Sequence, residues 1–458
     1  MKKLVKVVSL MLVIIMGLSL VACGEKTVEI KETGSETQSA STNEAGEATD
    51  ATEVKSEDPV ELSIMHFLVR ETGTGQDLTM LDRIDAFLES HPNVTLNQEI
   101  MSHDSYEQKI KTLAAANEMP DIFFVKGSMV DTFVENDIIA PLNSALDERP
   151  EWKDGFKDGI FDDFMRETDI YGIPFALNIT SLIYYNEAIL KEVGINEFPK
   201  TWVEFETAII AIKAAGYTPI ALGNKGKWVA ESCILSTLGD RFTGSEWFGS
   251  VKNKEASFED PDFVKALDAF QGLAEIGAFN DDMNSIDNNQ QKTLFYAGNA
   301  AMFMEGSWAI SSVEQDAPEE ISSVTGVALI PSVDGGKGEQ AAVSGGAGWA
   351  IQINPKLEGA EREAALDLIE MLSDTEAATL AVEANSFPAS IPGEYDQTKL
   401  TPLMLKVEEL LKGVQYTPIY DVQLSPSIIE TMNSGLQELL SGIITPEELA
   451  AKIQKENK

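Results

Sequence analysis

The chain has 458 residues, and its 75 acidic residues against 34 basic ones give a formal net charge of −41. So negative a field repels phosphate backbones, which argues against nucleic acid as a partner, and it also keeps the protein off anionic lipid surfaces. The length predicts two or three domains.

Histidine and cysteine are too scarce and scattered to suggest metal or redox chemistry. His66, His91 and His103 do not lie at metal-ligand spacing from one another or from a cysteine, so we expect no metal site and no cofactor. Besides Cys23 near the N-terminus there is one other cysteine, Cys233, and a single thiol cannot form an intramolecular disulfide. We interpret Cys233 as a small buried apolar side chain, with a nucleophile as the alternative.

The first 22 residues have the three parts of a secretory signal peptide. Three lysines among the first six residues precede the apolar run 10–15, and small residues follow just before Cys23. The apolar run is too short for an ordinary membrane span. The sequence Leu20-Val21-Ala22-Cys23 resembles a bacterial lipobox, which implies that Cys23 is lipidated and anchors the protein to the outer face of the bacterial cell membrane. The alternative is a signal peptide that is cleaved without lipid attachment.

Residues 23–58 are predicted to be a flexible acidic tether. They are rich in Glu, Thr, Ser, Ala and Gly and contain no aromatic residue. Such a segment cannot bury enough apolar area to offset its ordering entropy. As a flexible coil it would let the folded part of the protein move freely above the membrane.

From Val60 onward the sequence alternates between strand and helix patterns. We expect strands at 61–67, 93–100 and 120–125, and helices at 78–88 and from Tyr106. This alternation predicts an α/β fold with a mainly parallel sheet. Ligands of such sheets bind beyond the carboxyl ends of the strands, so the loops after Phe67 and Val125 are candidate ligand loops.

The same alternation continues through the second half. Strands are predicted at 179–186, 218–223, 326–331 and 348–353, and helices at 187–194, 201–215 and over much of the chain from Pro402. Thr201 and Glu204 have the spacing of a capping box at a helix start, and Gly216 would close that helix. Thr445, just before Pro446, is the expected cap of the last helix.

A glycine-rich stretch spans residues 335–348. It lacks the G-x-G-x-x-G motif between a strand and a helix and the lysine-serine pair of a Walker loop. We therefore interpret it as a hairpin or crossover where the chain turns sharply, with phosphate binding as the alternative.

Four segments, in this order along the chain, resemble the extracellular solute-binding protein family 1 of ABC importers, the group that includes maltose-binding protein. They are residues 111–125, 171–205, 294–310 and 348–374. The resemblance implies a two-lobe fold of the periplasmic-binding-protein type II, with α/β lobes and a ligand cleft at the hinge. It further implies a monomer without enzymatic activity that captures a sugar or oligosaccharide as its lobes close, and delivers it to the permease subunits of an importer.

The resemblance also suggests that each lobe is discontinuous in sequence. One lobe would comprise 59–175 plus 343–388, and the other 178–340 plus 391–458. The hinge would lie near Pro174 and Phe175, the glycine-rich stretch and residues 385–390. Such hinge strands absorb backbone rotation while each lobe moves as a body.

A sugar offers C–H faces that pack on flat aromatic rings and hydroxyls that need polar partners. By position in the family pattern, Trp308 is the first candidate for an aromatic platform, and Trp228 and Trp349 follow. The alternative for each of these tryptophans is a role in the core. Trp202 matches a structural position of the family, so it is not a candidate. The polar candidates are Asn178, Arg70, Glu71, Lys126, Ser128 and Asn433, with a solvated surface pair as the alternative for Arg70 and Glu71.

The sequence departs from maltose-binding protein at several ligand positions. Val125, Ser128 and Met129 stand where that protein has an aromatic residue and an Asp-Arg pair. Ile429 replaces a late tryptophan, and Asn433 replaces a nearby arginine. The platform for linear maltodextrins is therefore not reproduced.

Two other functions remain open. A secreted carbohydrate-active enzyme would need two carboxylates across the scissile bond or a Ser-His-Asp set, and no motif in the sequence points to either. A sugar-sensing surface lipoprotein would bind sugar but feed no importer. Extra repeat modules would favour it, and the sequence contains none.

Overall fold

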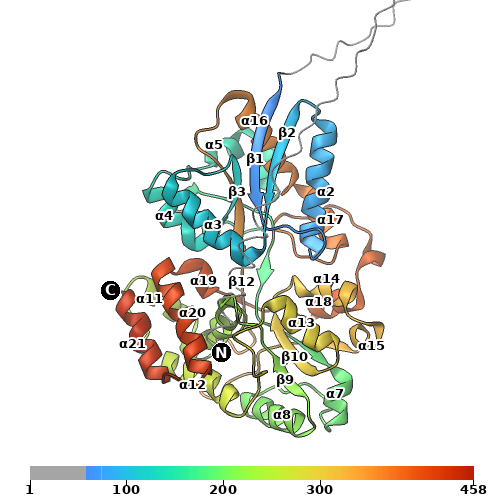
Figure 1. Ribbon diagram of the computed structural model, residues 1–458, viewed down its shortest axis with the longest axis vertical. Helices are drawn as coiled ribbons and strands as arrows, with labels where there is room; N and C mark the ends of the chain where they lie inside the picture. The colour runs from blue at the N-terminus through green and yellow to red at the C-terminus, as the bar shows by residue number, and fades with distance from the viewer. Residues whose placement is uncertain (1–57, 74) are drawn as a thin grey trace, which may run out of the picture. The chain divides into compact units, whose positions relative to one another are not determined.

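The structure is a computed structural model that describes residues 58–73 and 75–458. The predicted signal peptide, Cys23 and the tether up to residue 57 therefore lie outside the described residues. The described part contains two main sheets, each with helices against it (Figure 1). We call the part built on the first sheet lobe 1 and the part built on the second lobe 2.

Lobe 1 is built on a five-stranded sheet with the order β2-β1-β3-β13-β6. β1 (Val60–His66) runs parallel to β2 (Val94–Ile100) and to β3 (Ile122–Lys126). β13 (Trp349–Ile353) runs antiparallel to β3 and to β6 (Ile173–Pro174). Every residue of β3 is buried, which explains its continuous apolar sequence.

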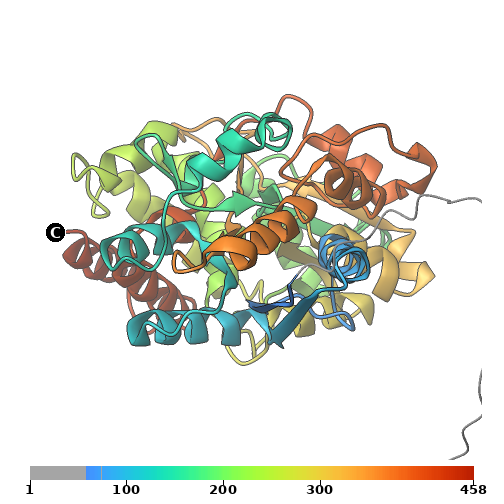
Figure 2. The same cartoon turned by 90° about the horizontal axis from the view of Figure 1, so that it is seen from above.

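The helices of lobe 1 come from two distant stretches of the chain. α2 (Gly75–Ser90) packs against α16 (Gly359–Met371) and α17 (Thr375–Glu383), and Figure 2 shows α16 in orange beside α2 in blue. The lobe's buried core accordingly draws on residues 60–176 and 347–389. The other elements are α3 (His103–Ala116), η2 (Gly127–Met129), α4 (Val130–Glu135), α5 (Asn143–Glu148), α6 (Pro150–Asp154), η3 (Asp162–Phe164), β4 (Met165–Arg166) and β5 (Asp169–Ile170), and the short η5 (Gln397–Lys399) follows α17 in the chain.

Lobe 2 is built on a four-stranded sheet with the order β11-β8-β10-β9. β9 (Thr218–Ala221) and β10 (Ala300–Glu305) are parallel, and β8 (Leu182–Asn186) is antiparallel to β10 and to β11 (Thr325–Leu329). Its buried residues lie between 179 and 343 and between 403 and 453. Lobe 2 therefore also has its own core, assembled from two stretches of the chain.

Helices surround this second sheet. They are α7 (Glu187–Glu192), α8 (Trp202–Ala214), α9 (Trp228–Ala230), η4 (Glu231–Leu235), α10 (Ser236–Thr243), α11 (Ser245–Lys252), α12 (Pro261–Glu275), α13 (Asn288–Tyr296), α14 (Ala309–Asp316), α15 (Glu319–Ser322), α18 (Pro402–Leu410), α19 (Tyr420–Gln423), α20 (Pro426–Leu440) and α21 (Pro446–Glu456). Across residues 58–73 and 75–458, no helix combines the length and the apolarity that a membrane span requires.

The segments that connect the lobes lie side by side. β7 (Asn178–Ile179) follows β6 of lobe 1 and pairs with β12 (Val343–Gly346), which in turn precedes β13 and pairs with β14 (Tyr416–Thr417). The third connection, at residues 385–390, is joined to the first, because the backbone N–H of Leu177 donates to the carbonyl of Phe387 (2.8 Å). Paired connecting strands allow the lobes to rotate about a common region. The lobe boundaries given above stay a prediction.

The α/β class and the two-lobe arrangement are confirmed, but the sheets are mixed rather than mainly parallel. The reason is that strands arriving from the other lobe, such as β13, enter the sheet in the reverse direction. The capping box is present, since the Thr201 hydroxyl accepts from the backbone N–H of Glu204. The glycine-rich stretch leads into a crossover as predicted, and Gly335 and Gly348 adopt positive φ angles of 72° and 71°. Cys233 is a free, fully buried thiol.

Tyr106 completes the hydrogen bonding of β3 where its partner strand stops. β1 pairs with β3 only at Ile122 and Phe123, and the next residue, Phe124, exchanges two bonds with the Tyr106 hydroxyl instead. The hydroxyl donates to the carbonyl oxygen of Phe124 (2.7 Å) and accepts from its N–H (2.6 Å), inside the core. Tyr106 thus holds the end of the strand that carries Lys126.

We predict that Tyr106→Phe lowers the free energy of unfolding by about 1–3 kcal/mol, because it leaves two buried backbone groups without a partner. Urea unfolding followed by circular dichroism measures the change. Tyr217→Phe is the matched control, since its hydroxyl bonds an exposed Glu192. Equal effects in the two variants would contradict the role given to Tyr106.

Candidate ligand-binding site

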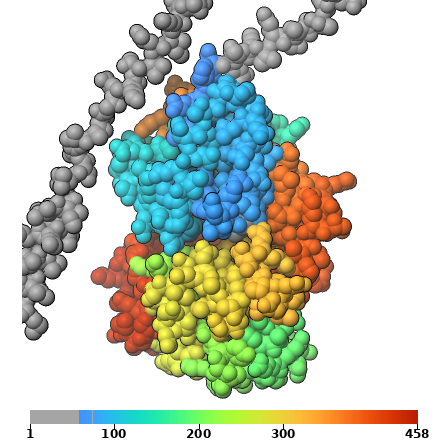
Figure 3. Space-filling model, turned by 45° about the vertical axis from the view of Figure 1, so that its right-hand side comes forward, coloured from blue at the N-terminus to red at the C-terminus, as the bar shows by residue number. Residues whose placement is uncertain are grey.

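A cavity of about 420 Å³ lies between the two lobes. It is within the usual size range of small-molecule sites. Figure 3 shows the blue and cyan surface of lobe 1 meeting the yellow surface of lobe 2 along a seam. Lobe 1 contributes Phe67, Val69, Thr72, Gln76, Asp77, His103, Lys126 and Trp349; lobe 2 contributes Thr180, Trp228, Ser232, Asn288, Lys292, Ser307, Trp308 and Asp421; the connections contribute Phe175, Asn178, Ser386 and Phe387.

Three tryptophans from different parts of the chain line this cavity. Trp349 begins β13 of lobe 1 and packs edge-on against Phe67, with ring centroids 5.1 Å apart. Trp228 and Trp308 of lobe 2 lie against each other at 6.0 Å and 56°. His103 lies between the two groups, 5.4 Å from Trp349 and 5.7 Å from Trp228. Aromatic surface is therefore presented to the cavity from both lobes.

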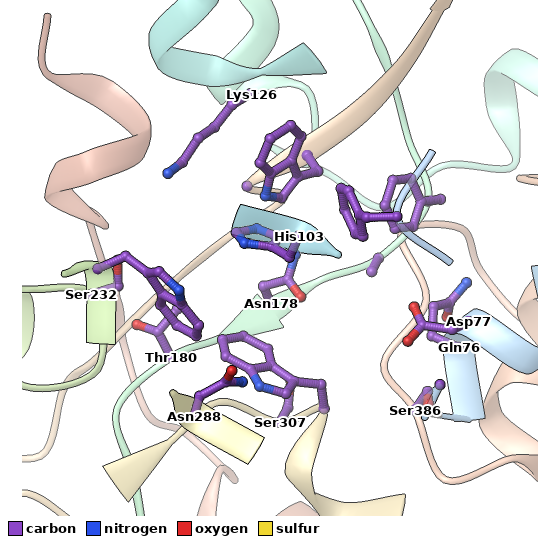
Figure 4. A pocket seen from close by; sticks show the side chains of 18 of the residues that line it. Gln76, Asp77, His103, Lys126, Asn178, Thr180, Ser232, Asn288, Ser307 and Ser386 are labelled. Atoms are coloured by element: carbon purple, nitrogen blue, oxygen red, sulfur yellow. The ribbon is translucent and has the colours of Figure 1, made fainter. Parts of the chain in front are cut away.

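Two buried polar side chains on the cavity wall lack hydrogen-bond partners. Within the described residues, no partner exists for Oε1 of Gln76 or for Oγ of Ser386, and these residues are 7% and 5% exposed. They lie together on one side of the cavity in Figure 4, beside Asp77. A buried polar atom without a partner costs about 1–3 kcal/mol, and a ligand group that reached these two atoms would remove that cost.

The lysine on the opposite side of the cavity is already neutralised. Lys126, at the end of β3, is 2.6 Å from a carboxylate oxygen of Asp421 in lobe 2 and 3.6 Å from Glu107 in lobe 1. Burial alone would lower the pKa of Lys126, but its attraction to Asp421 and Glu107 outweighs this and raises that pKa. Glu231, also nearby, is fully buried, and its burial raises its own pKa. Lys126 is thus a structural cation that joins the lobes.

Contacts between the lobes occur near both sides of the cavity. On one side, the backbone N–H of Gly75 donates to the hydroxyl of Ser311 in lobe 2 (2.9 Å). On the other, besides Lys126 and Asp421, the Gln423 amide donates to Asp163 of lobe 1 (3.1 Å). Figure 4 places Gln76, next to Gly75, and Lys126 on opposite sides. The cavity is therefore flanked by lobe-to-lobe contacts at both sides.

Five of the predicted site residues line the cavity: Trp308, Trp228, Trp349, Asn178 and Lys126. Asn178 lies in the connection, where its side-chain N–H donates to the carbonyl of Ala347 (2.6 Å). Their contact with a ligand stays a prediction.

Four predicted residues lie elsewhere. Arg70 is exposed and turns toward its own lobe, where it forms ion pairs with Asp82 (2.6 Å) and Asp85 (2.8 Å) of α2. Glu71 is exposed and Ser128 is half-buried in η2, and neither is among the cavity-lining residues. Asn433 is buried within α20, also away from the cavity wall.

Sequence reasoning missed Gln76, Ser386, His103 and Asn288. The sequence could have indicated Ser386, because residues 385–390 were expected at the hinge. Gln76 lies at the start of a helix and has no distinguishing motif. Among the described residues, no group of three or more His, Cys, Asp or Glu side chains could hold a metal ion.

We predict that Glu107 contributes to stability in a pH-dependent way. The charge of Lys126 lowers the pKa of Glu107 from 4.5 to about 2, so its ionised form stabilises the fold above pH 4.5, and this contribution is lost as the pH falls through that range toward 2. The difference in unfolding free energy between the native protein and Glu107→Gln should therefore be constant above about pH 5 and shrink between about pH 5 and pH 2, the window of these two pKa values. Urea titrations measure it, with Glu89→Gln, exposed on α2, as the control. A pH-independent difference would contradict the assignment.

Comparison with known proteins places the chain among binding proteins. Curated relatives from Brucella abortus are 24% identical over 249 residues, which cover 54% of this chain and 58% of their own length. The chain thus matches little more than half of these relatives.

Two solved structures match more of the chain. One comes from work on xylan utilization by the thermophilic bacterium Caldanaerobius polysaccharolyticus, with 27% identity, a TM-score of 0.77 and coverage of 87% of this chain and 100% of that one. The other is a chitin oligosaccharide binding protein, with 26% identity, a TM-score of 0.79 and coverage of 88% and 98%. The family model for bacterial extracellular solute-binding proteins matches residues 73–379. The chain belongs to the bacterial extracellular solute-binding protein family.

Proposed function

We propose that this protein is the extracellular receptor of an ABC importer, which captures a sugar or short oligosaccharide between its lobes and delivers it to the permease subunits. The observation that carries the proposal is the composition of the cavity wall. Aromatic rings come from both lobes, and the buried polar atoms of Gln76 and Ser386 await a partner. A ligand that touches both lobes favours their closed arrangement, which couples binding to recognition by the importer.

The wall suits the two kinds of surface that a sugar presents. Its C–H faces can pack on Trp308, Trp228 and Trp349, and each buried ring face contributes in the range of about 1–3 kcal/mol. Its hydroxyls can bond the amides and hydroxyls around them, such as Asn288 and Thr180. A micromolar affinity needs about 8 kcal/mol in total, which a few such contacts supply.

The charges of the wall favour an uncharged ligand. Lys126 is paired with Asp421, and burial raises the pKa of the Glu305 carboxyl, an effect that the nearby charge of Lys292 offsets only in part. No arginine is among the described residues that line the cavity. A phosphate or carboxylate would have to displace an existing carboxylate from its lysine, which is costly in a buried site.

A hydrolytic function has less support from the same wall. The carboxylates that line it are Asp77 and Asp421, and Asp421 is bound to Lys126. Figure 4 shows Asp77 across the cavity from Lys126. A two-carboxylate mechanism needs an acid and a base that both face the scissile bond, so this arrangement favours binding without turnover.

Attachment to the membrane through lipidated Cys23, and a monomeric state, belong to the same proposal. Support for the lipid comes from the sequence pattern around Cys23, which lies outside the described residues. Metabolic labelling with a fatty-acid analogue, compared between the native protein and Cys23→Ser, tests it.

We predict that neutral oligosaccharides stabilise the protein and anionic solutes do not. In a thermal-shift panel, xylotriose and triacetylchitotriose represent the first class, and glucuronic acid and glycerol 3-phosphate the second. A ligand at 100 times its dissociation constant adds about 2.7 kcal/mol of stability. Stabilisation by the anions alone would contradict the neutral class, and release of shorter sugars during incubation would support an enzyme instead.

We predict that Gln76→Leu separates binding from stability. The substitution removes a buried amide oxygen that has no partner among the described residues, so the ligand-free protein should be as stable as before or more stable, while affinity for the best sugar of the panel falls about tenfold. Isothermal titration calorimetry and urea unfolding measure the two quantities. Thr79→Val is the control on the same helix: the Thr79 hydroxyl bonds the carbonyl of Gly75 (2.8 Å), and Thr79 does not line the cavity, so stability rather than affinity should change. Unchanged affinity in Gln76→Leu would remove this residue from the site.

A further inference from the structure

Glu305 lies directly behind the cavity wall, at the end of β10. Its side chain is fully buried, and it is not among the residues that line the cavity. Its carboxylate accepts hydrogen bonds from the indole N–H of Trp308 (2.8 Å), from the Asn288 amide (3.3 Å) and from the Gln291 amide. Two of these donors, Trp308 and Asn288, are themselves on the cavity wall. One buried carboxylate therefore connects to two candidate ligand contacts.

Hydrogen-bond donors face both carboxylate oxygens of Glu305, so both of these atoms must be acceptors. The Gln291 amide cannot turn over, because its oxygen accepts from the N–H of Gly223 (2.7 Å) and its nitrogen also donates to the carbonyl of Met304 (3.2 Å). Gln291 must therefore present an N–H to one carboxylate oxygen, and the indole of Trp308 can only donate to the other. A glutamine at position 305 would set its NH₂ group against one of these two donors.

The ring of Trp308 is also held from the side. A Cβ atom at Gly306 would lie 2.1 Å from Cζ3 of the indole. The ring therefore packs directly against the backbone of Gly306, and any larger residue at this position would clash with it. Trp228 lies 6.0 Å away on the cavity side. Because the bond to Glu305 and the contact with Gly306 act on different parts of the ring, together they determine its orientation.

We propose that Glu305 is a positioning residue, which holds Trp308 and Asn288 in the orientation that receives the ligand. The inference rests on the proposed function, and it extends that function to a residue that never touches the ligand. Pre-orienting the ring lowers the ordering cost of binding, which increases affinity without adding a contact. A merely structural Glu305 would stabilise lobe 2 and leave ligand affinity independent of the Trp308 N–H.

A double-mutant cycle tests this coupling. We expect Glu305→Gln to weaken the binding of xylotriose or triacetylchitotriose, whichever binds more tightly, about tenfold. In the Trp308→Phe background, which keeps a ring but has no N–H, Glu305→Gln should weaken binding less, by about threefold, because only the longer bond from Asn288 (3.3 Å) is still lost on that side of the carboxylate. Equal losses in the two backgrounds would overturn the proposal.

A second readout needs no ligand, so it separates failure of this inference from failure of the proposed function. The indole N–H signal of Trp308 in a ¹H–¹⁵N spectrum is identified by its loss in Trp308→Phe. In Glu305→Gln its hydrogen exchange should accelerate at least about tenfold, as expected for loss of a charge-assisted bond. The indole of Trp247, which donates to Asp260 in the same lobe (2.9 Å), is the matched control and should not change. Unchanged exchange at Trp308, or equal acceleration at both indoles, would overturn the assignment.

The variant Gly306→Ala disturbs the ring of Trp308 without changing Glu305. It also provides a test if Glu305→Gln folds poorly. The added methyl group should displace the indole, weaken sugar binding about tenfold and accelerate exchange at Trp308 but not at Trp247. If both sugar affinity and the exchange rate of the Trp308 N–H stay at their native values, the contacts behind the ring do not control binding, and the proposal fails.

Discussion

The structure depends on one constraint: two separately packed lobes are joined by chain segments that lie next to one another. Each lobe draws its core from two stretches of sequence, so neither can be completed before the chain has crossed from one lobe to the other and returned. The connections pair through β7 and β12 and through Leu177 and Phe387. Because these connections meet in one region, the space between the lobes is lined from both sides. The cavity is a consequence of this topology.

Charge in that space is balanced before any ligand arrives. Lys126 of lobe 1 meets Asp421 of lobe 2, and Glu107 adds a second carboxylate from the lysine's own lobe. Buried ion pairs add little net stability, because desolvation offsets their attraction, but an unpaired partner is strongly unfavourable. The pair therefore favours one alignment of the lobes and leaves no free cation on that side for an anion. This explains how a strongly acidic protein can have a cleft in which the charge of Lys126 is balanced.

The polar groups on the cavity wall are of two kinds, which differ in whether they already have hydrogen-bond partners within the protein. Trp308 and Asn288 each donate to Glu305 behind the wall, which limits their movement. Gln76 and Ser386 each have one buried oxygen that has no hydrogen-bond partner among the described residues. Under the proposed function, groups of the first kind would lower the ordering cost of binding, and those of the second would gain hydrogen bonds from the ligand.

Local features were readable from the sequence because they depend on near neighbours. The capping box at Thr201 and Glu204, the buried strand β3 and the turns at Gly335 and Gly348 needed only spacing and residue type. Trp308, Trp228, Trp349, Asn178 and Lys126, which the sequence offered as ligand contacts, do line the cavity, and their contact with a ligand stays a prediction.

Only the tertiary structure decided which distant residues meet. Gln76 and Ser386 come together because α17 packs on α2, and Arg70 turns away because Asp82 and Asp85 on α2 attract it. Antiparallel strands enter both sheets because the chain returns from the other lobe. The role of Glu305 depends on donors at positions 288, 291 and 308, which are spaced unlike any local motif. Sequence determines the local elements through short-range backbone and capping preferences, whereas the site is assembled from long-range packing that such preferences do not encode.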